Sequence, residues 1–174
     1  MAVDLTLKST YITDREATPK VVHNPGQGGI GTSQSAYGYI ASVTASLSAT
    51  SVIRFVDVPS NAVVHSVLVS SAAQTAGKFN IGVYRTNADG GLVAAASADS
   101  FFTTDLDCAS AVVDQECVMK ATSGNTIAKR AQPLWQAIGM ATDPGGRLDI
   151  CATVHTTDVT TGTGAMGVLV KYSV

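Results

Sequence analysis

The heptapeptide Leu148-Asp149-Ile150-Cys151-Ala152-Thr153-Val154 shows the pattern that decides the fold of this 174-residue chain. Apolar side chains recur at every second position of it, so one face of an extended strand is hydrophobic. The same period returns in residues 166–172, at Met166, Val168, Val170 and Tyr172. Because only a small, threonine- and glycine-rich stretch, residues 156–164, separates these two strands, we expect a terminal β-hairpin.

Four more stretches upstream carry the same period of two. They are residues 36–47, 51–58, 62–71 and 78–86. Their predicted apolar faces include Tyr37 and Tyr39 in the first stretch, Val63, Val67 and Val69 in the third, and Phe79, Ile81 and Val83 in the fourth. Turn residues follow two of these stretches, at Pro59-Ser60-Asn61 and at Asn87-Ala88-Asp89-Gly90-Gly91.

The middle of the chain carries weaker signals. Residues 92–102 form an alanine-rich candidate strand, and residues 103–130 indicate a long irregular excursion with at most one short strand, at 117–119. One helix-like pattern follows: Pro133 is placed early, apolar residues recur at helical spacing, and Asp143-Pro144-Gly145-Gly146 provides a stop. We therefore expect one short helix there.

Seven or eight short strands without a βαβ rhythm indicate an all-β fold, an antiparallel β-sandwich. A parallel α/β fold is excluded. Within the sandwich class we favour a jelly roll over an immunoglobulin-like fold. The Cys…Trp…Cys order of immunoglobulin domains fails here, because Trp135 lies in a helical context between Cys117 and Cys151.

Residues 1–35 differ from the predicted sandwich domain, residues 36–174. This N-terminal stretch contains Pro19, Pro25 and a glycine-rich run at 26–31, and it lacks a sustained period. We therefore expect an extended arm that ends in a flexible joint and reaches at most about 115 Å. Its scattered apolar residues are Val3, Leu5, Leu7, Tyr11, Ile12, Val21 and Val22.

Composition excludes several classes of protein. Ala, Val, Thr, Ser and Gly make up 97 of the 174 residues, 14% of residues are charged, and the net charge is −2. Disorder of the whole chain is excluded, and the charge balance offers no footprint for direct nucleic-acid binding. No stretch approaches the length of a membrane helix, and the start of the chain is not a secretory signal, so we expect synthesis in the cytosol.

Residues that could carry chemistry are few and scattered. Cys108, Cys117 and Cys151 lack the spacing of a zinc site, and we interpret them as small buried residues, with a Cys108–Cys117 bridge as the alternative. A cupin-like metal site needs two histidines two positions apart, whereas His65 and His155 would meet only on neighbouring strands. We therefore predict no catalytic residues, no metal site, no cofactor and no enzymatic activity.

Several short motifs, in their order along the chain, resemble one family. They are the arm before a glycine-rich joint, Val58-Pro59-Ser60-Asn61-Ala62-Val63-Val64, Gly77-Lys78-Phe79-Asn80-Ile81-Gly82-Val83, Pro133-Leu134-Trp135-Gln136-Ala137-Ile138-Gly139 and the final Val170-Lys171-Tyr172. In this order the chain resembles the jelly-roll capsid decoration proteins, or cement proteins, of tailed bacteriophages such as the Bordetella phage.

The resemblance implies a structural protein on the outer surface of a virion capsid. Its partners would be the major capsid protein, whose neighbouring subunits it ties together, and itself, as a homodimer or homotrimer. The apolar residues of the arm then become the candidate capsid contacts. Two alternatives stay open: another virion component, such as a head fibre base or a tail adaptor, and a cupin-like metal-binding enzyme.

Overall fold

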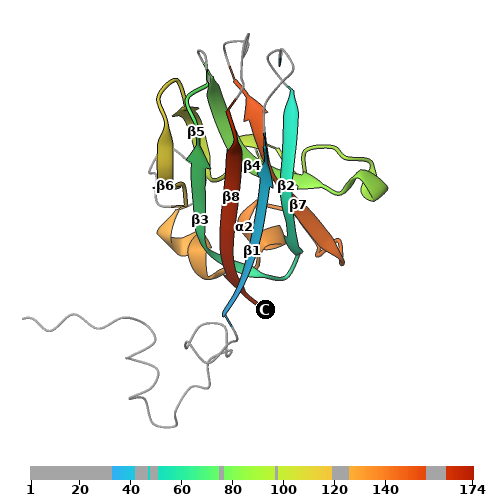
Figure 1. Cartoon of the computed structure of the whole chain (residues 1–174). Helices are drawn as coiled ribbons and strands as arrows, with labels where there is room; N and C mark the ends of the chain where they lie inside the picture. The colour runs from blue at the N-terminus through green and yellow to red at the C-terminus, as the bar shows by residue number, and fades with distance from the viewer. Residues whose placement is uncertain are drawn as a thin grey trace, which may run out of the picture. The chain divides into compact units, whose positions relative to one another are not determined.

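The computed structural model describes residues 33–41, 47, 51–74, 77–96, 98–118, 126–155 and 164–174. They belong to one compact unit, Ser33–Val174 (Figure 1). The strands of this described part are β1 (Ser33–Ile40), β2 (Val52–Pro59), β3 (Val63–Ser71), β4 (Lys78–Arg85), β5 (Thr103–Asp107), β6 (Val112–Glu116), β7 (Arg147–Val154) and β8 (Met166–Ser173). The short helices are η1 (Asn87–Asp89), η2 (Ala98–Ser100), η3 (Ile127–Ala131) and α2 (Leu134–Ala137).

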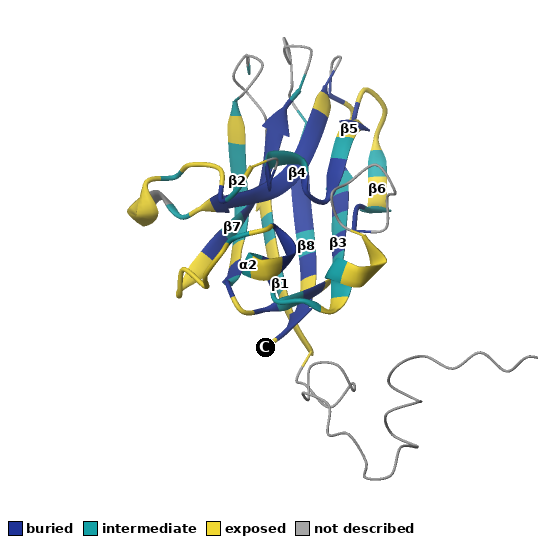
Figure 2. Ribbon diagram, turned by 180° about the vertical axis from the view of Figure 1, so that it is seen from behind, coloured by how far each residue is buried: buried dark blue, intermediate teal, exposed yellow. Residues whose placement is uncertain are grey.

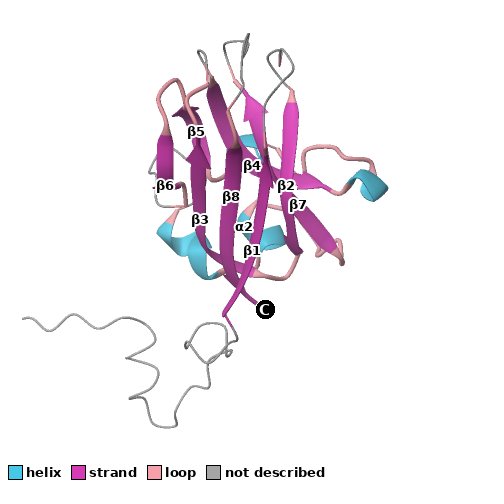
Figure 3. Ribbon diagram, in the orientation of Figure 1, coloured by secondary structure: helices cyan, strands magenta, loops and turns pink. Residues whose placement is uncertain are grey.

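The strands form two four-stranded antiparallel sheets, so the predicted all-β antiparallel sandwich is confirmed (Figure 3). One sheet has the order β1-β8-β3-β6 and the other the order β2-β7-β4-β5. Successive strands change sheet at every step except from β4 to β5. The helices are short and lie between strands, so the sheets alone supply the layers of the fold.

The hydrophobic core lies between the two sheets. Val67 and Val69 of β3 and Val168 of β8 have no exposed surface, and neither have Ile81 of β4 and Ile150 of β7 in the opposite sheet. Figure 2 shows β4 and β8 as largely buried strands. The alternation of apolar residues that predicted β4, β7 and β8 therefore reflects which of their side chains face the core.

The predicted terminal hairpin is wrong. β7 pairs with β2 and β4, whereas β8 pairs with β1 and β3 in the other sheet. The chain therefore crosses the sandwich between its last two strands. Their apolar faces meet through the core rather than through main-chain hydrogen bonds.

The predicted strand at residues 92–102 is also wrong. Val93 forms an isolated bridge to Tyr84, and the helix η2 follows it. At Gly82 of β4 an added Cβ would lie 2.2 Å from the carbonyl oxygen of Ala98. The small residues of this stretch therefore let its main chain pack directly on β4, which a β-strand in an adjacent layer does not do.

Residues 103–130 contain more strand than expected. β5 and β6 both lie there, and neither coincides with the predicted strand at 117–119. Each of these edge strands contains a left-handed aspartate, Asp105 at φ 52° and Asp114 at φ 47°. A left-handed residue breaks the alternation of side chains along a strand. A search for a period of two therefore misses such a strand.

Two predicted apolar faces need correction. Tyr37 and Tyr39 are 65% and 64% exposed, and their neighbours Ala36 and Ile40 pack against the core instead. In β3 the register shifts between Val64 and Ser66, so Val64 rather than Val63 shares the buried face with Val67 and Val69. That shift is a β-bulge, which moves the alternation by one residue.

The predicted helix is confirmed as the four-residue α2, preceded by Pro133. Gly145 and Gly146, in the predicted stop, have φ of 67° and 79°, a backbone conformation that glycine adopts without strain. Residues 1–32 of the predicted arm lie outside the described residues, and the last three residues of that prediction belong to β1.

Candidate interaction surface

Exposed aromatic side chains gather on the outer face of the sheet β1-β8-β3-β6. In the register of the sheet Tyr39 pairs with Gly167 of β8, which in turn pairs with Ser70 of β3. Tyr37 pairs in the same way with Leu169, and Leu169 with Leu68. Because cross-strand partners share a face, these six residues point away from the core.

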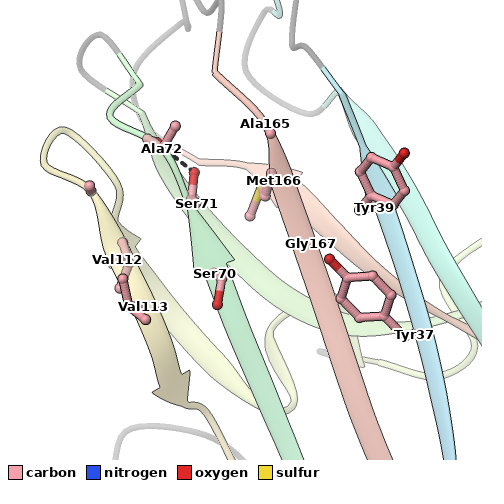
Figure 4. A pocket seen from close by; sticks show the side chains of 11 residues that line it. Tyr37, Tyr39, Ser70, Ser71, Ala72, Val112, Val113, Ala165, Met166 and Gly167 are labelled. Atoms are coloured by element: carbon pink, nitrogen blue, oxygen red, sulfur yellow. Dashed lines mark hydrogen bonds between the residues drawn. The ribbon is translucent and has the colours of Figure 1, made fainter.

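A groove of about 360 Å³ crosses this face (Figure 4). Tyr37 and Tyr39 form one side of it and Val112 and Val113 the other, and Gly167 lies between them. Val113 is 81% exposed and projects into solvent, as the two tyrosines do, whereas Val112 packs against the core. We call this feature, with Ser70, the tyrosine groove.

Gly167 of β8 makes room for the two tyrosines of β1. A Cβ at this position would lie 2.9 Å from the hydroxyl oxygen of Tyr37 and 3.3 Å from the Cβ of Tyr39. The absence of a side chain therefore lets the Tyr37 ring lie over β8, with the Cβ of Tyr39 beside it. Their centroids are 6.1 Å apart and their planes differ by 18°, so they present one aromatic surface.

The serine hydroxyls of the groove are hydrogen-bonded within the protein. The Ser70 hydroxyl donates to Asp114 Oδ1 over 3.0 Å, and the Asp114 N–H donates back to Ser70 Oγ over 3.0 Å. The Ser71 hydroxyl donates to the carbonyl oxygen of Ala72 over 2.8 Å. The tyrosine groove therefore offers a ligand mainly apolar contact, together with the Tyr37 hydroxyl, which lies beside Gly167.

The edges of the sandwich are less suited to binding. Asp105 interrupts the edge strand β5 and Asp114 the edge strand β6, and such bulges prevent an incoming strand from pairing. At the other side a Cβ on Gly38 of β1 would lie 2.1 Å from the carbonyl oxygen of Phe55 of β2. The two sheets therefore meet through their main chains along this side. The outer face of the sheet β1-β8-β3-β6 is then more accessible to a binding partner than the edges are.

The opposite sheet carries a polar network instead. Arg54 of β2 donates to Asp149 Oδ2 over 2.5 Å, to the Arg85 carbonyl over 2.8 Å and to the Gly91 carbonyl over 2.7 Å. A second ion pair joins Arg147 and Asp57. The Arg54 network ties β2, β7, β4 and the turn after β4 together, which gives it a structural role.

Two groups near Arg54 have perturbed acidity. Burial raises the pKa of the Cys151 thiol to about 12, and burial also raises the pKa of the Tyr84 hydroxyl, which is hydrogen-bonded to Thr153 over 2.7 Å. A high pKa keeps the thiol protonated and therefore unreactive near neutral pH. Cys108 and Cys117 are buried thiols as well, as the interpretation of small buried residues requires.

The two histidines of the described residues do not come together. His65 lies on β3 and approaches Ser173 Oγ at 2.9 Å, whereas His155 follows β7 in the other sheet and approaches Asp105 Oδ1 at 2.5 Å. The described residues contain no cluster of three or more potential metal ligands. Within the same residues no helix is long and apolar enough to span a membrane.

The predicted contact residues of the arm, Val3 to Val22, all lie outside the described residues. Trp135, on the helix α2, is half-buried, whereas Leu134 and Ala137 of the same helix are buried. The tyrosine groove itself was not predicted, although the exposed pair Tyr37 and Tyr39 flanking Gly38 is its sequence signal.

Comparison with known proteins gives one informative result. No protein-family model matches the chain, and no curated protein matches it. The solved structure of the cyanophage Pam1 capsid asymmetric unit contains a chain of similar fold, with a TM-score of 0.51 and 14% sequence identity. The likeness covers 91% of this chain and 96% of that one, so it extends over nearly the whole of both.

Proposed function

We propose that this chain is a structural protein of a bacteriophage virion that binds the outer surface of the capsid and cements neighbouring major capsid subunits. The observation that carries the proposal is the similarity of fold, over nearly the full length of both chains, to a chain of a phage capsid. The order of motifs that resembles capsid decoration proteins supports the same role independently.

We infer further that the sandwich is a jelly roll. The eight strands change sheet at every step except from β4 to β5, and the two sheets have the orders β1-β8-β3-β6 and β2-β7-β4-β5. This arrangement fits two interleaved Greek keys, in which a late strand returns to lie beside an early one. β8 lies between β1 and β3, and β7 lies between β2 and β4, as that topology requires.

The described sandwich suits a building block that packs against other proteins. Its face carries exposed tyrosines, and its edge strands β5 and β6 are interrupted by Asp105 and Asp114. Interrupted edges hinder open-ended strand pairing, so a protein present in many copies on a shell remains soluble before assembly. Such a protein then associates through defined surfaces.

In this proposal residues 1–35 reach across to a second capsid subunit through Val3, Leu5, Leu7, Tyr11, Ile12, Val21 and Val22. A body seated on one subunit and an arm laid over another raise each other's effective concentration. Self-association as a dimer or trimer multiplies the effect. Because the protein then binds the assembled shell in preference to free subunits, it stabilises the shell by mass action.

The experiment is to add the purified full-length chain to heads produced without it. We expect saturable binding at a fixed number of copies per head, and heads that retain their DNA at higher temperature. Binding to tails but not to heads would instead favour the alternative of a tail adaptor. Stoichiometric bound metal with substrate turnover, and no binding to either, would favour the enzyme alternative.

A further inference from the structure

We propose that the end of the sandwich at which β1 begins is seated on the capsid, and that it binds an acidic, partly apolar surface of the major capsid protein. We call it the basal end. It comprises Ile127, Lys129 and Arg130 of η3, together with Lys171 of β8 and the start of β1 at Ser33. The inference rests on the proposed capsid function and specifies the face and the chemistry of that contact.

Three successive contacts place η3 beside the start of β1. Ser33 pairs with Ser173 of β8 in the register of the sheet. His65 Nε2 lies 2.9 Å from Ser173 Oγ, and Arg130 Nη2 donates to the His65 carbonyl oxygen over 3.1 Å. Figure 1 shows the short helices η3 and α2, in orange, at the end of the sandwich where β1 begins. The point at which residues 1–32 join the described part of the chain therefore lies on this end.

η3 presents an exposed aliphatic side chain next to cations that the fold holds in place. Ile127 is 90% exposed, the highest value among the large apolar side chains of the described residues. Residues three apart share a side of a 3₁₀ helix, so Arg130 lies one turn from Ile127 on the same side. Lys129 Nζ lies 5.8 Å from the ring centroid of Phe101, which is buried. Because interface centres are apolar and their rims polar, η3 has the composition of an interface anchor.

Two cations of the basal end form no ion pair among the described residues. They are Lys129 and Lys171, and Lys171 is exposed on β8. Two carboxylates at this end, Glu116 and Asp143, each accept hydrogen bonds from a serine hydroxyl over 2.6 Å and from main-chain N–H groups. Their charge is therefore directed toward donors of the protein itself. The basal end complements a partner surface that carries carboxylates of its own.

The position of the basal end also suits the proposed arm. The glycine-rich run at 26–31 ends two residues before Ser33. A sandwich seated on this end lets the arm run directly onto the shell. If the sandwich were seated on its opposite end, the arm would first have to return along the eight-residue β1, about 27 Å, which would use about eight of its residues. The basal end and the arm therefore act on the same surface, where each raises the effective concentration of the other.

The charge balance favours a protein partner over nucleic acid. Binding to DNA depends on many phosphate contacts made by cations. The basal end offers Lys129, Arg130 and Lys171, and the whole chain has a net charge of −2. A phosphate backbone also offers no apolar surface to cover Ile127. An acidic protein surface with an apolar recess matches both features, so the partner is the major capsid protein of the proposed function.

Binding of the purified full-length chain to heads produced without it, over a range of salt concentration, tests the proposal. We expect Ile127→Ser and, separately, Lys129→Glu to weaken binding at least about tenfold. Wild-type binding should weaken as the salt concentration rises. Binding of the Lys129→Glu variant should depend less on salt, because one attraction between opposite charges has been removed.

Each variant has a matched control away from the basal end. Val113→Ser removes an aliphatic side chain that is 81% exposed on β6, in the tyrosine groove. Lys78→Glu makes the same change in charge at the start of β4, which lies at the opposite end of the sandwich. Both control variants should bind within about twofold of the wild type. Circular dichroism checks that every variant is folded, and Ile127→Ser keeps the test valid where Lys129→Glu is not.

The proposal is wrong if the η3 variants bind as tightly as the wild type, if salt leaves wild-type binding unchanged, or if the control variants are weakened as much as their counterparts. A chain that binds duplex DNA as tightly as heads would overturn the choice of a protein partner. A wild-type chain that never binds heads refutes the capsid function together with this inference. Wild-type binding that the η3 variants share refutes this inference alone.

Discussion

Gly38 of β1 lies directly against the main chain of Phe55 in β2, so that a Cβ on Gly38 would stand 2.1 Å from the Phe55 carbonyl oxygen. Phe55 is the extra residue of a β-bulge, between Arg54 and Val56 in the register with β7. Two strands of different sheets therefore touch through their backbones, and this side of the sandwich closes without side chains between them. The contact also turns Tyr37 and Tyr39 outward, onto the exposed face.

The Gly38 contact predicts that one added methyl group has a large effect on the stability of the protein. Gly38→Ala should lower the free energy of unfolding by about 3 kcal/mol, because the main chain of β2 cannot move without disturbing its pairing with β7. Ser35→Ala, on the exposed face of the same strand, should change it by less than about 0.5 kcal/mol. Urea denaturation of the two variants measures the difference, and equal stabilities would show that the close contact is relaxed in solution.

The Arg54 network should contribute far more to the free energy of unfolding than the ion pair between Arg147 and Asp57. Arg54→Met leaves Asp149, whose side chain is 15% exposed, without its cation and removes two hydrogen bonds to carbonyls, so we expect a loss of about 2–3 kcal/mol. Arg147 and Asp57 are about half exposed, so Arg147→Met should cost less than about 1 kcal/mol. Comparable losses in chemical denaturation would mean that burial does not distinguish the two pairs.

The left-handed conformation of Asp114 predicts different effects on stability and solubility for two substitutions. Asp114→Gly should cost less than about 1 kcal/mol, since glycine adopts φ near 47° without strain and only the exposed hydrogen bond to Ser70 is lost. Asp114→Val should destabilise the protein by about 1–2 kcal/mol and promote aggregation, because a β-branched residue favours a regular edge strand open to pairing. Light scattering during thermal unfolding separates the two variants. If the Asp114→Val variant stays as soluble as the Asp114→Gly variant, edge protection by this residue is excluded.

The Cys151 thiol predicts a loss of stability in alkali. Its pKa is about 12 in the folded protein, above that of an unfolded thiol, so the folded state holds the proton more tightly. This contribution is complete below about pH 9 and disappears as the pH rises toward 12, at up to about 1.4 kcal/mol per pH unit. Stability of Cys151→Ala should therefore fall less steeply between pH 9 and 11. Tyr84 titrates in both proteins, so identical slopes would refute the assignment to Cys151.

The proposed arm predicts that folding and capsid binding separate. Deleting residues 1–30 should leave the melting temperature of the sandwich unchanged, since the compact unit begins at Ser33, and should weaken binding to heads by at least about 100-fold. Replacing Val3, Leu5 and Leu7 by serine keeps the length of the arm and removes apolar contacts only. Full occupancy of heads by the truncated chain would remove the arm from the mechanism.

The sandwich was predictable where one face of a strand is buried and the backbone is regular. In β7 and β8 the residues Leu148 to Val154 and Met166 to Tyr172 alternate because every second side chain enters the core. Pairing was not predictable from this pattern, because alternation is the same whether two strands share a sheet or face each other across the core. The terminal hairpin failed for that reason.

The other errors have local physical causes. Asp105 and Asp114 break the alternation of β5 and β6, and a bulge shifts it in β3. Hydrophobicity places Tyr37 and Tyr39 inside, but the main chain of Phe55 beside Gly38 leaves room on the inner side only for smaller neighbours such as Ala36. The tyrosine groove follows from that packing, which no single strand encodes.

The central claim is that this chain sits on the outside of a capsid, and the most direct measurement is an electron cryomicroscopy reconstruction of the purified virion. The account predicts density for the β1-β8-β3-β6 and β2-β7-β4-β5 sandwich outside the shell, at symmetry-related positions that bridge neighbouring major capsid subunits. Its presence only at the tail or in a fibre, or its absence from the particle, would contradict the account.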